Sequence, residues 1–237
     1  PTGYCDDYAA MALACFTLYQ ATGDEQWFRE GAQLADATVD LFADTEGDGF
    51  YATAHNAERL IARPKNLFDL PPPSDNSLAA EVMLSMAAFT GESVWWDRLE
   101  SVLRLGARII AQHPAGAGHL LAVAAVMLAP PLEVAVVGPG RDHLIAVLHE
   151  TYRPRVFLAQ GDGEHPSAVP LLAGRHAPAT EAAAYVCRGF VCDRPVSRAD
   201  ELRDALTDGG APRALSRYRH SKADENPNPG GSLDSST

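Results

Sequence analysis

The sequence predicts a mainly α-helical protein built of helical hairpins, followed by a small α/β segment. Helical periodicity dominates the first half, where an apolar segment followed by an amphipathic one occurs at 8–42 and again at 77–111. This αα-hairpin repeat has a period of about 70 residues. After Pro130-Pro131 the pattern changes to short β-branched runs, which are typical of strands.

The first hairpin begins with a helix that follows Asp6-Asp7-Tyr8 and runs to about Gln20. Apolar residues lie on nearly all of its sides, so we expect an inner helix that is buried on both sides. The turn Thr22-Gly23-Asp24 ends it. The second helix, at 26–42, has one apolar face and one charged face, which predicts an outer layer.

A loop region separates the two hairpins. Residues 44–49 form a predicted turn, and 50–53 could pair with 60–63 as a short β-hairpin. The stretch 63–77 then reads R-P-K-N-L-F-D-L-P-P-P-S-D-N-S, and its prolines exclude a helix or a central strand because they fix φ and remove backbone donors. We predict a rigid loop that brings four polar residues to the next helix: Ser74, Asp75, Asn76 and Ser77.

The second hairpin repeats the pattern of the first. An inner helix is predicted at 77–90, and Thr90-Gly91-Glu92 ends it much as a similar turn ends the first helix. An outer amphipathic helix follows at 94–111. The apolar segment 118–128 is the next predicted inner helix, and Pro130-Pro131 stops it.

Short strands alternate with helices in the second part, which indicates a βαβ-like unit. The predicted elements are a strand at 134–137, a helix at 142–152, a strand at 155–158, a third strand at 183–187 and a last helix from about 197 to 206. The Gly, Pro, Asn and Ser content after residue 207 predicts disorder. The predicted divisions are therefore a helical part at 1–130, an α/β extension at 131–207 and a disordered tail at 208–237.

Composition narrows the classes of partner. The net charge of -12, from 19 basic against 31 acidic residues, argues against nucleic acid. No run of about 18 apolar residues exists, so no membrane span is expected. Because Pro1 opens the sequence without a signal-like segment, we interpret the chain as a piece of a longer protein. Four cysteines are too few for a disulfide scaffold, which favours a reducing cytoplasm.

Antiparallel hairpins would place the N-termini of the first, third and fifth helices at one end of the molecule. We call this end the mouth, and it would gather Asp6, Asp7, Tyr8, the loop 63–77, His113 and His119. Helix N-termini carry partial positive charge and unpaired N–H groups, which suits a polar or anionic ligand. Asp7 and Asp69 could divide the roles of general acid and base. The alternative is that these carboxylates only cap helices.

Three other motifs carry little weight. Residues 44–49 faintly resemble a calcium loop, but His55 stands where a bidentate Glu is needed. Gly138-Pro139-Gly140 lacks the Lys-Ser/Thr of a phosphate loop, which favours a plain tight turn. Cys187 and Cys192 are too far apart for the usual redox pair, which leaves free thiols or an adventitious disulfide. We expect neither a metal nor a cofactor.

Several short motifs in a fixed order carry a resemblance to a known family: Asp6-Asp7-Tyr8-Ala9, Gly49-Phe50-Tyr51, Arg63-Pro64-Lys65, Asp69, Pro73-Ser74, Asn76-Ser77, and Ala184-Tyr185-Val186-Cys187 with Phe190 and Cys192. Over about residues 3–206 the chain resembles the C-terminal half of thioredoxin-domain proteins of the spermatogenesis-associated type. Asp75 stands where that family usually has a glycine. The resemblance implies a partial (α/α) six-hairpin toroid, similar to N-acylglucosamine 2-epimerases and glycosidases, and a thioredoxin-like domain that this chain lacks.

The resemblance implies two hypotheses about function. In the first, the toroid binds or processes a sugar or similar polar molecule, with Asp7 and Asp69 as the catalytic pair and a polar lining of Tyr8, Arg63, Lys65, Ser74, Asn76 and Ser77. In the second, the toroid is a non-catalytic scaffold that presents the thioredoxin-like domain to protein clients. Fold does not establish function, so the carbohydrate hypothesis rests on analogy. Apolar inner-helix surface should be exposed where the remaining hairpins would pack.

Overall fold

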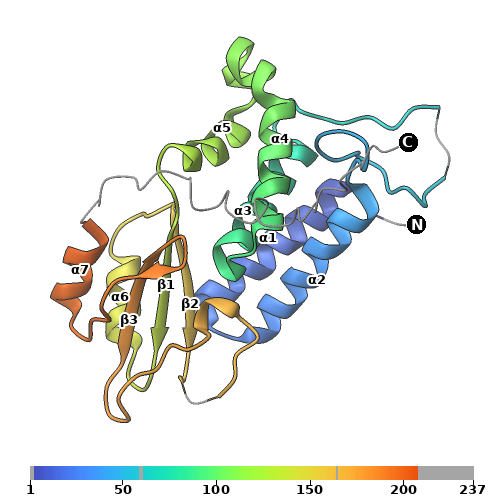
Figure 1. Cartoon of the computed structure of the whole chain (residues 1–237). Coiled ribbons are helices and arrows are strands. Elements are labelled where there is room, and N and C mark those ends of the chain that lie inside the picture. Colours follow the sequence, from blue (N-terminus) through green and yellow to red (C-terminus); the bar gives the residue numbers. More distant parts are fainter. Residues whose placement is uncertain (1–2, 59–60, 164, 208–237) are drawn as a thin grey trace, which may run out of the picture.

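A computed structural model describes residues 3–58, 61–163 and 165–207. In this part of the chain about half of the residues are helical, with seven α-helices and a mixed sheet of four strands (Figure 1). The mainly α fold class with a small α/β segment is thus confirmed at this coarse level. The tail predicted to be disordered, 208–237, lies outside the described residues.

The first hairpin consists of α1 (Cys5–Thr22) and α2 (Glu25–Phe42). Gly23 ends α1 in the left-handed conformation, with φ of 72°, which glycine adopts without steric cost. Asp24 then caps α2, because its side chain accepts a hydrogen bond from the Gln26 N–H. Both helices agree with the sequence prediction to within a few residues.

The predicted burial of α1 on both sides is wrong. Its buried residues lie on one face: Cys5, Ala9, Ala12, Cys15, Phe16 and Tyr19. On another face Tyr4, Met11 and Leu18 are 60%, 58% and 41% exposed, and they follow one another at intervals of seven residues. The reason is that α2 and α3 pack against only part of the helix. The expectation of apolar surface where further hairpins would pack stays a prediction.

Helix α3 (Asp75–Thr90) is the central helix of the fold. Of its 16 residues 13 are buried, because α1, α4 (Ser93–Gln112) and α5 (Gly118–Ala124) pack around it. The chain continues past α5 as one 3₁₀ turn, Ala125–Met127, so the predicted fifth helix is shorter as an α-helix than expected. The helices form stacked hairpins, and the toroid itself stays a prediction.

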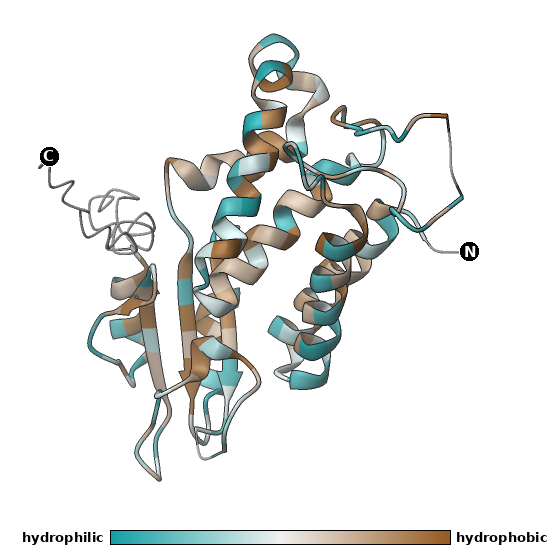
Figure 2. Ribbon diagram, turned by 45° about the vertical axis from the view of Figure 1, so that its right-hand side comes forward, coloured by the Kyte–Doolittle hydropathy of each residue, from teal (hydrophilic) through white to brown (hydrophobic). Residues whose placement is uncertain are grey.

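The sheet has the strand order β2-β1-β3-β4. Strand β1 (Leu132–Val137) pairs in parallel with β2 (Val156–Gly161) through the crossover helix α6 (Asp142–His149), which confirms the βαβ unit. Strand β3 (Ala183–Arg188) runs antiparallel to β1, and the short β4 (Val191–Cys192) pairs with β3. Strand β1 is hydrophobic along most of its length (Figure 2), as expected of a strand covered on both faces.

Helices cover both faces of the sheet. One core unites the helical hairpins with the sheet face that contains Val137 and Phe157. A second core joins the opposite face to α6 and α7 (Ala199–Thr207). The edge of β2 is tied to α1, since the Leu158 N–H donates to Gln20 Oε1 at 3.0 Å and the Gln160 N–H donates to Tyr19 at 3.3 Å. The predicted division at residue 130 stays a prediction.

The predicted hairpin between 50–53 and 60–63 is wrong where the structure describes these residues. Phe50 forms an isolated bridge with Ala43 instead, and the Ala52 N–H donates to the Pro64 carbonyl at 2.8 Å. The cause is a side chain distant in sequence: Asn76 Oδ1 accepts from the Phe50 N–H at 2.8 Å, and its amide donates to the Phe50 carbonyl at 2.9 Å. Both backbone groups of Phe50 are therefore unavailable for a hairpin.

Candidate functional site

Asp69 is the residue that joins the loop 63–77 to two helices. Its side chain accepts a hydrogen bond from the Ser74 N–H at 2.9 Å, just before α3, and one from the His119 N–H at 2.7 Å, in the first turn of α5. Burial alone would raise the pKa of Asp69, but the hydrogen bonds from Ser74, Ser77 and His119 outweigh it and lower the pKa. Asp69 is thus an ionised cap shared by two helix N-termini.

Asp7 has a similar local role at α1. Its Oδ2 accepts a hydrogen bond from the Tyr4 N–H at 2.8 Å, so the carboxylate satisfies a backbone donor at the helix N-terminus. Tyr8 packs edge-on against Phe42, with ring centroids 5.3 Å apart. Tyr8 thus contributes to the packing of the first hairpin, and the assignment of Asp7 and Asp69 as acid and base stays a prediction.

The start of α3 is a buried polar joint. Ser74, Asn76 and Ser77 are at most 6% exposed. Ser74 caps the helix, because its Oγ accepts from the Ser77 N–H at 3.1 Å. Asn76 holds Phe50 on one side and donates to the Asn66 carbonyl at 2.9 Å on the other. These three predicted ligand-binding residues use their polar atoms to fix the loop.

Arg63 and Lys65 both pack on the ring of Tyr51. The Arg63 guanidinium lies 4.1 Å from the ring centroid and donates to the Thr53 carbonyl at 2.6 Å. Lys65 donates to Asp44 at 2.5 Å and lies 4.7 Å from the same ring. The hydrogen bond from Lys65 holds the pKa of Asp44 well below its usual range. This pair brings a cation into the segment that resembled a calcium loop, which disfavours a metal there.

No group of three or more His, Cys, Asp and Glu side chains that could hold a metal ion occurs among the residues that the structure describes. The same residues contain no helix that is both long and apolar enough to span a membrane. Neither finding identifies a ligand for the mouth.

The structure adds one pair to the mouth that the sequence analysis missed. His119 Nε2 lies 2.7 Å from Glu81, and the two side chains are 29% and 39% exposed. The hydrogen bond to Glu81 raises the pKa of His119. Glu81 lies one helical turn after Ser77, and this i,i+4 spacing was the signal that could have found it. His113, also expected here, packs against Phe68 with ring centroids 6.0 Å apart.

Asp75 is buried beside this joint, with 4% of its surface exposed. Burial raises its pKa to about 6, although its oxygens accept hydrogen bonds from the Asn76 N–H and the Asn66 amide. A carboxylate thus occupies the position where the resembled family has a glycine, and it makes internal contacts there.

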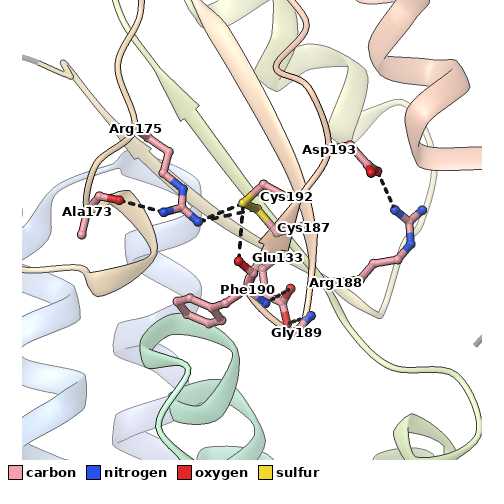
Figure 3. The surroundings of a disulfide bond; sticks show 9 residues. All are labelled: Glu133, Ala173, Arg175, Cys187, Arg188, Gly189, Phe190, Cys192 and Asp193. Atoms are coloured by element: carbon pink, nitrogen blue, oxygen red, sulfur yellow. Dashed lines mark hydrogen bonds and ion pairs between the residues drawn. A yellow bond between two sulfur atoms is a disulfide. The ribbon is translucent and has the colours of Figure 1, made fainter. Parts of the chain in front are cut away.

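The cysteine pair of the second part is a disulfide. Cys187 and Cys192 are bonded across the β3–β4 turn, whereas Cys5 and Cys15 are free and buried. Figure 3 shows the Arg175 guanidinium beside the disulfide, where its Nη2 donates to Cys192 Sγ at 2.9 Å. Of the alternatives left open by the sequence, the structure therefore has the bonded form.

Glu133 supports the turn that carries this disulfide. It is 1% exposed, and its two oxygens accept hydrogen bonds from the Gly189 and Phe190 N–H groups (Figure 3). Burial raises the pKa of Glu133 to about 7. Phe190 has a φ of 61°, a left-handed conformation that is rare for a bulky residue. The buried carboxylate therefore fixes the backbone of a strained turn.

Comparison with known proteins gives distant relatives for this chain. It is similar to spermatogenesis-associated protein 20 of Homo sapiens, with 26% identity over 213 residues, and to the proteins of that name in Mus musculus and Rattus norvegicus, each with 24% identity. These alignments cover 86% of the chain and 27% of each relative, so the chain spans about a quarter of their length. No family model matches the chain.

The relatives carry the name of the spermatogenesis-associated type that the sequence motifs resemble, and in this respect the comparisons support the resemblance. Their names state no substrate, partner or activity. The thioredoxin-like domain, the toroid and the cytoplasmic location remain predictions.

Proposed function

We propose that this chain is a non-catalytic helical scaffold within a longer protein, where it presents a thioredoxin-like domain, absent from these residues, to protein clients. The observation that supports this proposal is the double cap of Asp69, whose carboxylate accepts backbone hydrogen bonds from Ser74 and His119. A group that holds two helices together in this way is poorly suited to exchange protons with a substrate, because movement would uncap both.

A second candidate is the binding of a sugar or similar polar molecule at the mouth. The pair Glu81 and His119 favours it, because both side chains are partly exposed and face one another at 2.7 Å. A carboxylate that orients an imidazole is a common arrangement for proton transfer. The backbone N–H of His119 is held by Asp69, so the imidazole projects from a fixed position.

Thermal unfolding of the full chain with a panel of sugars and sugar phosphates tests both candidates. The scaffold predicts no ligand-dependent rise in melting temperature, and Asp69→Asn should lower the free energy of unfolding by about 2 to 3 kcal/mol because the lost hydrogen bonds are charged. The sugar candidate predicts a rise, since a ligand that binds only the folded state stabilises it.

Side-chain variants make the test selective. Glu81→Gln and His119→Gln leave the backbone cap at Asp69 in place and remove only the partly exposed pair. The matched control is His149→Gln, at the exposed end of α6. A melting-temperature rise with a sugar that is lost in the first two variants and kept in the control would contradict the scaffold and support sugar binding.

A further inference from the structure

A cavity of about 590 Å³ opens at the carboxyl ends of the two parallel strands, away from the mouth. The last residues of β1 and β2, Val137 and Gly161, line it, and the turn between α1 and α2 contributes Gly23 and Glu25. In α/β sheets, ligands bind outside the carboxyl ends of the strands. The volume lies within the range of small-molecule sites.

Two arginines line this cavity, and both have an unsatisfied donor. Arg141 lies at the N-terminus of α6, and Arg175 lies in the segment before β3. The Nε of each is buried and has no hydrogen-bond acceptor within the described part of the chain. Burying a donor of this kind without a partner costs about 1 to 3 kcal/mol. An anion in the cavity, close to these two guanidinium groups, would offset part of this cost electrostatically.

The other nitrogens of the two guanidinium groups fix their positions. Arg141 Nη1 lies 3.4 Å from the Gly138 carbonyl. Arg175 Nη1 donates to the Ala173 carbonyl at 2.7 Å, and its Nη2 donates to Cys192 Sγ (Figure 3). Arg175 is thus oriented by its hydrogen bonds to the wall, and both arginines lie at the cavity. A planar, oriented guanidinium is the group that recognises phosphate and carboxylate oxygens.

The acidic residues of the cavity are already paired with its wall. Glu25 accepts hydrogen bonds from Ser167 Oγ at 2.5 Å and from the Ala168 N–H at 3.0 Å, and it forms an ion pair with Arg29. Asp162 accepts from His165, with 2.7 Å between Oδ2 and Nδ1. The wall therefore supplies donors to its carboxylates and leaves the two arginines for a ligand. His176 also lines the cavity.

We propose that this cavity binds a small organic oxyanion, a phosphate ester or a carboxylate, through Arg141 and Arg175. The N-terminus of α6 adds a favourable partial positive charge at the same edge of the sheet. An inorganic anion would fill only part of the volume, so the remaining space accommodates an organic group. The site is independent of the mouth and does not rest on the scaffold function.

Isothermal titration calorimetry of the full chain with inorganic phosphate and, separately, with citrate tests the proposal at matched ionic strength. We expect saturable binding of one or both anions, and the tighter of the two identifies the source as a phosphate ester or a carboxylate. Arg141→Gln and Arg175→Gln should each weaken binding at least about tenfold, because each removes a charged hydrogen bond.

Two further variants keep the test decisive. Arg155→Gln removes the same charge near the amino end of β2, where the guanidinium donates to the Ala129 carbonyl, and it should leave binding unchanged. Ala173→Glu adds a carboxylate at an exposed position of the cavity wall. This carboxylate should form ion pairs with the arginines and so abolish anion binding, without perturbing the core. No saturable binding of either anion, or an equal loss in Arg155→Gln, would overturn the proposal.

Discussion

The mouth and the cavity are both rich in polar residues, but they differ in what those residues contact. At the mouth, the carboxylates of Asp7 and Asp69 accept hydrogen bonds from backbone N–H groups. In the cavity, Arg141 and Arg175 each have a buried Nε with no acceptor among the residues that the structure describes. We therefore expect the cavity, rather than the mouth, to be the part of the molecule that gains most from a bound anion.

The largest expected effect concerns the joint at Asn76. Asn76→Ala should lower the free energy of unfolding by about 4 kcal/mol, because it leaves both backbone groups of Phe50 and the Asn66 carbonyl without their partner. Urea denaturation measures this loss. The control is Asn56→Ala, in an exposed turn, which should change stability by less than about 0.5 kcal/mol. A loss of similar size in the control would contradict a structural joint.

The two parts should also differ in the sign of their pH dependence. Glu133 has a pKa of about 7 against its ordinary 4.5, so its folded form binds a proton more tightly than its unfolded form. Its contribution to stability is therefore full below pH 4.5 and is lost as the pH rises to 7, by on the order of 3 kcal/mol. The lowered pKa of Asp69 acts the other way, and its contribution is lost as the pH falls.

Urea denaturation of Glu133→Gln and Asp69→Asn between pH 3 and pH 8 measures this difference. The first variant should lose the decline between about pH 4.5 and 7, and the second should lose part of the decline in acid. An unchanged slope in Glu133→Gln would mean that Glu133 is not buried as described.

A smaller effect is expected from the disulfide that Arg175 contacts. Because only five positions separate Cys187 from Cys192, the chain-entropy model gives a stabilisation of about 2 kcal/mol. Chemical denaturation with and without dithiothreitol measures it. The double variant Cys187→Ser, Cys192→Ser should show no response to the reductant, since Cys5 and Cys15 form no disulfide. A change of stability with dithiothreitol in that variant would mean that the reductant does not act through this disulfide.

The smallest effect is expected at the outer part of the loop 63–77. Arg63→Leu removes the cation that lies 4.1 Å from the centre of the Tyr51 ring and its hydrogen bonds to the Thr53 carbonyl, and should cost about 1.5 kcal/mol. The melting temperature should fall by a few degrees, and the exposed Arg155→Leu provides a comparison. If Arg63→Leu instead abolished the response to a sugar, the mouth would be a ligand site after all.

Local sequence patterns predicted most elements of this fold. The amphipathic helices α2 and α4 and the βαβ unit follow from spacing and caps close in sequence. Burial was harder to predict, because α1 is as apolar as an inner helix and yet has neighbours on only one side. The hairpin prediction failed because the partner of Phe50 is Asn76, a side chain 26 residues away.

The candidate sites were also hard to predict, because they depend on contacts between residues far apart in the sequence. The loop 63–77 was found because prolines and cap residues are concentrated there, but its polar atoms proved to be used internally. The cavity had only the weak signal of Gly138-Pro139-Gly140, because four separate segments assemble it. Nothing near Arg175 in the sequence indicates that it lines the same cavity as Arg141.

The ties between α1 and β2 have a consequence for how this protein can associate. An edge strand normally offers a row of free N–H and C=O groups to another chain. Here Gln20 and Tyr19 accept hydrogen bonds from the outward N–H groups of Leu158 and Gln160, and the opposite edge is the two-residue β4. Growth of the sheet by strand addition, the route to fibrillar aggregates, is thereby hindered at both edges.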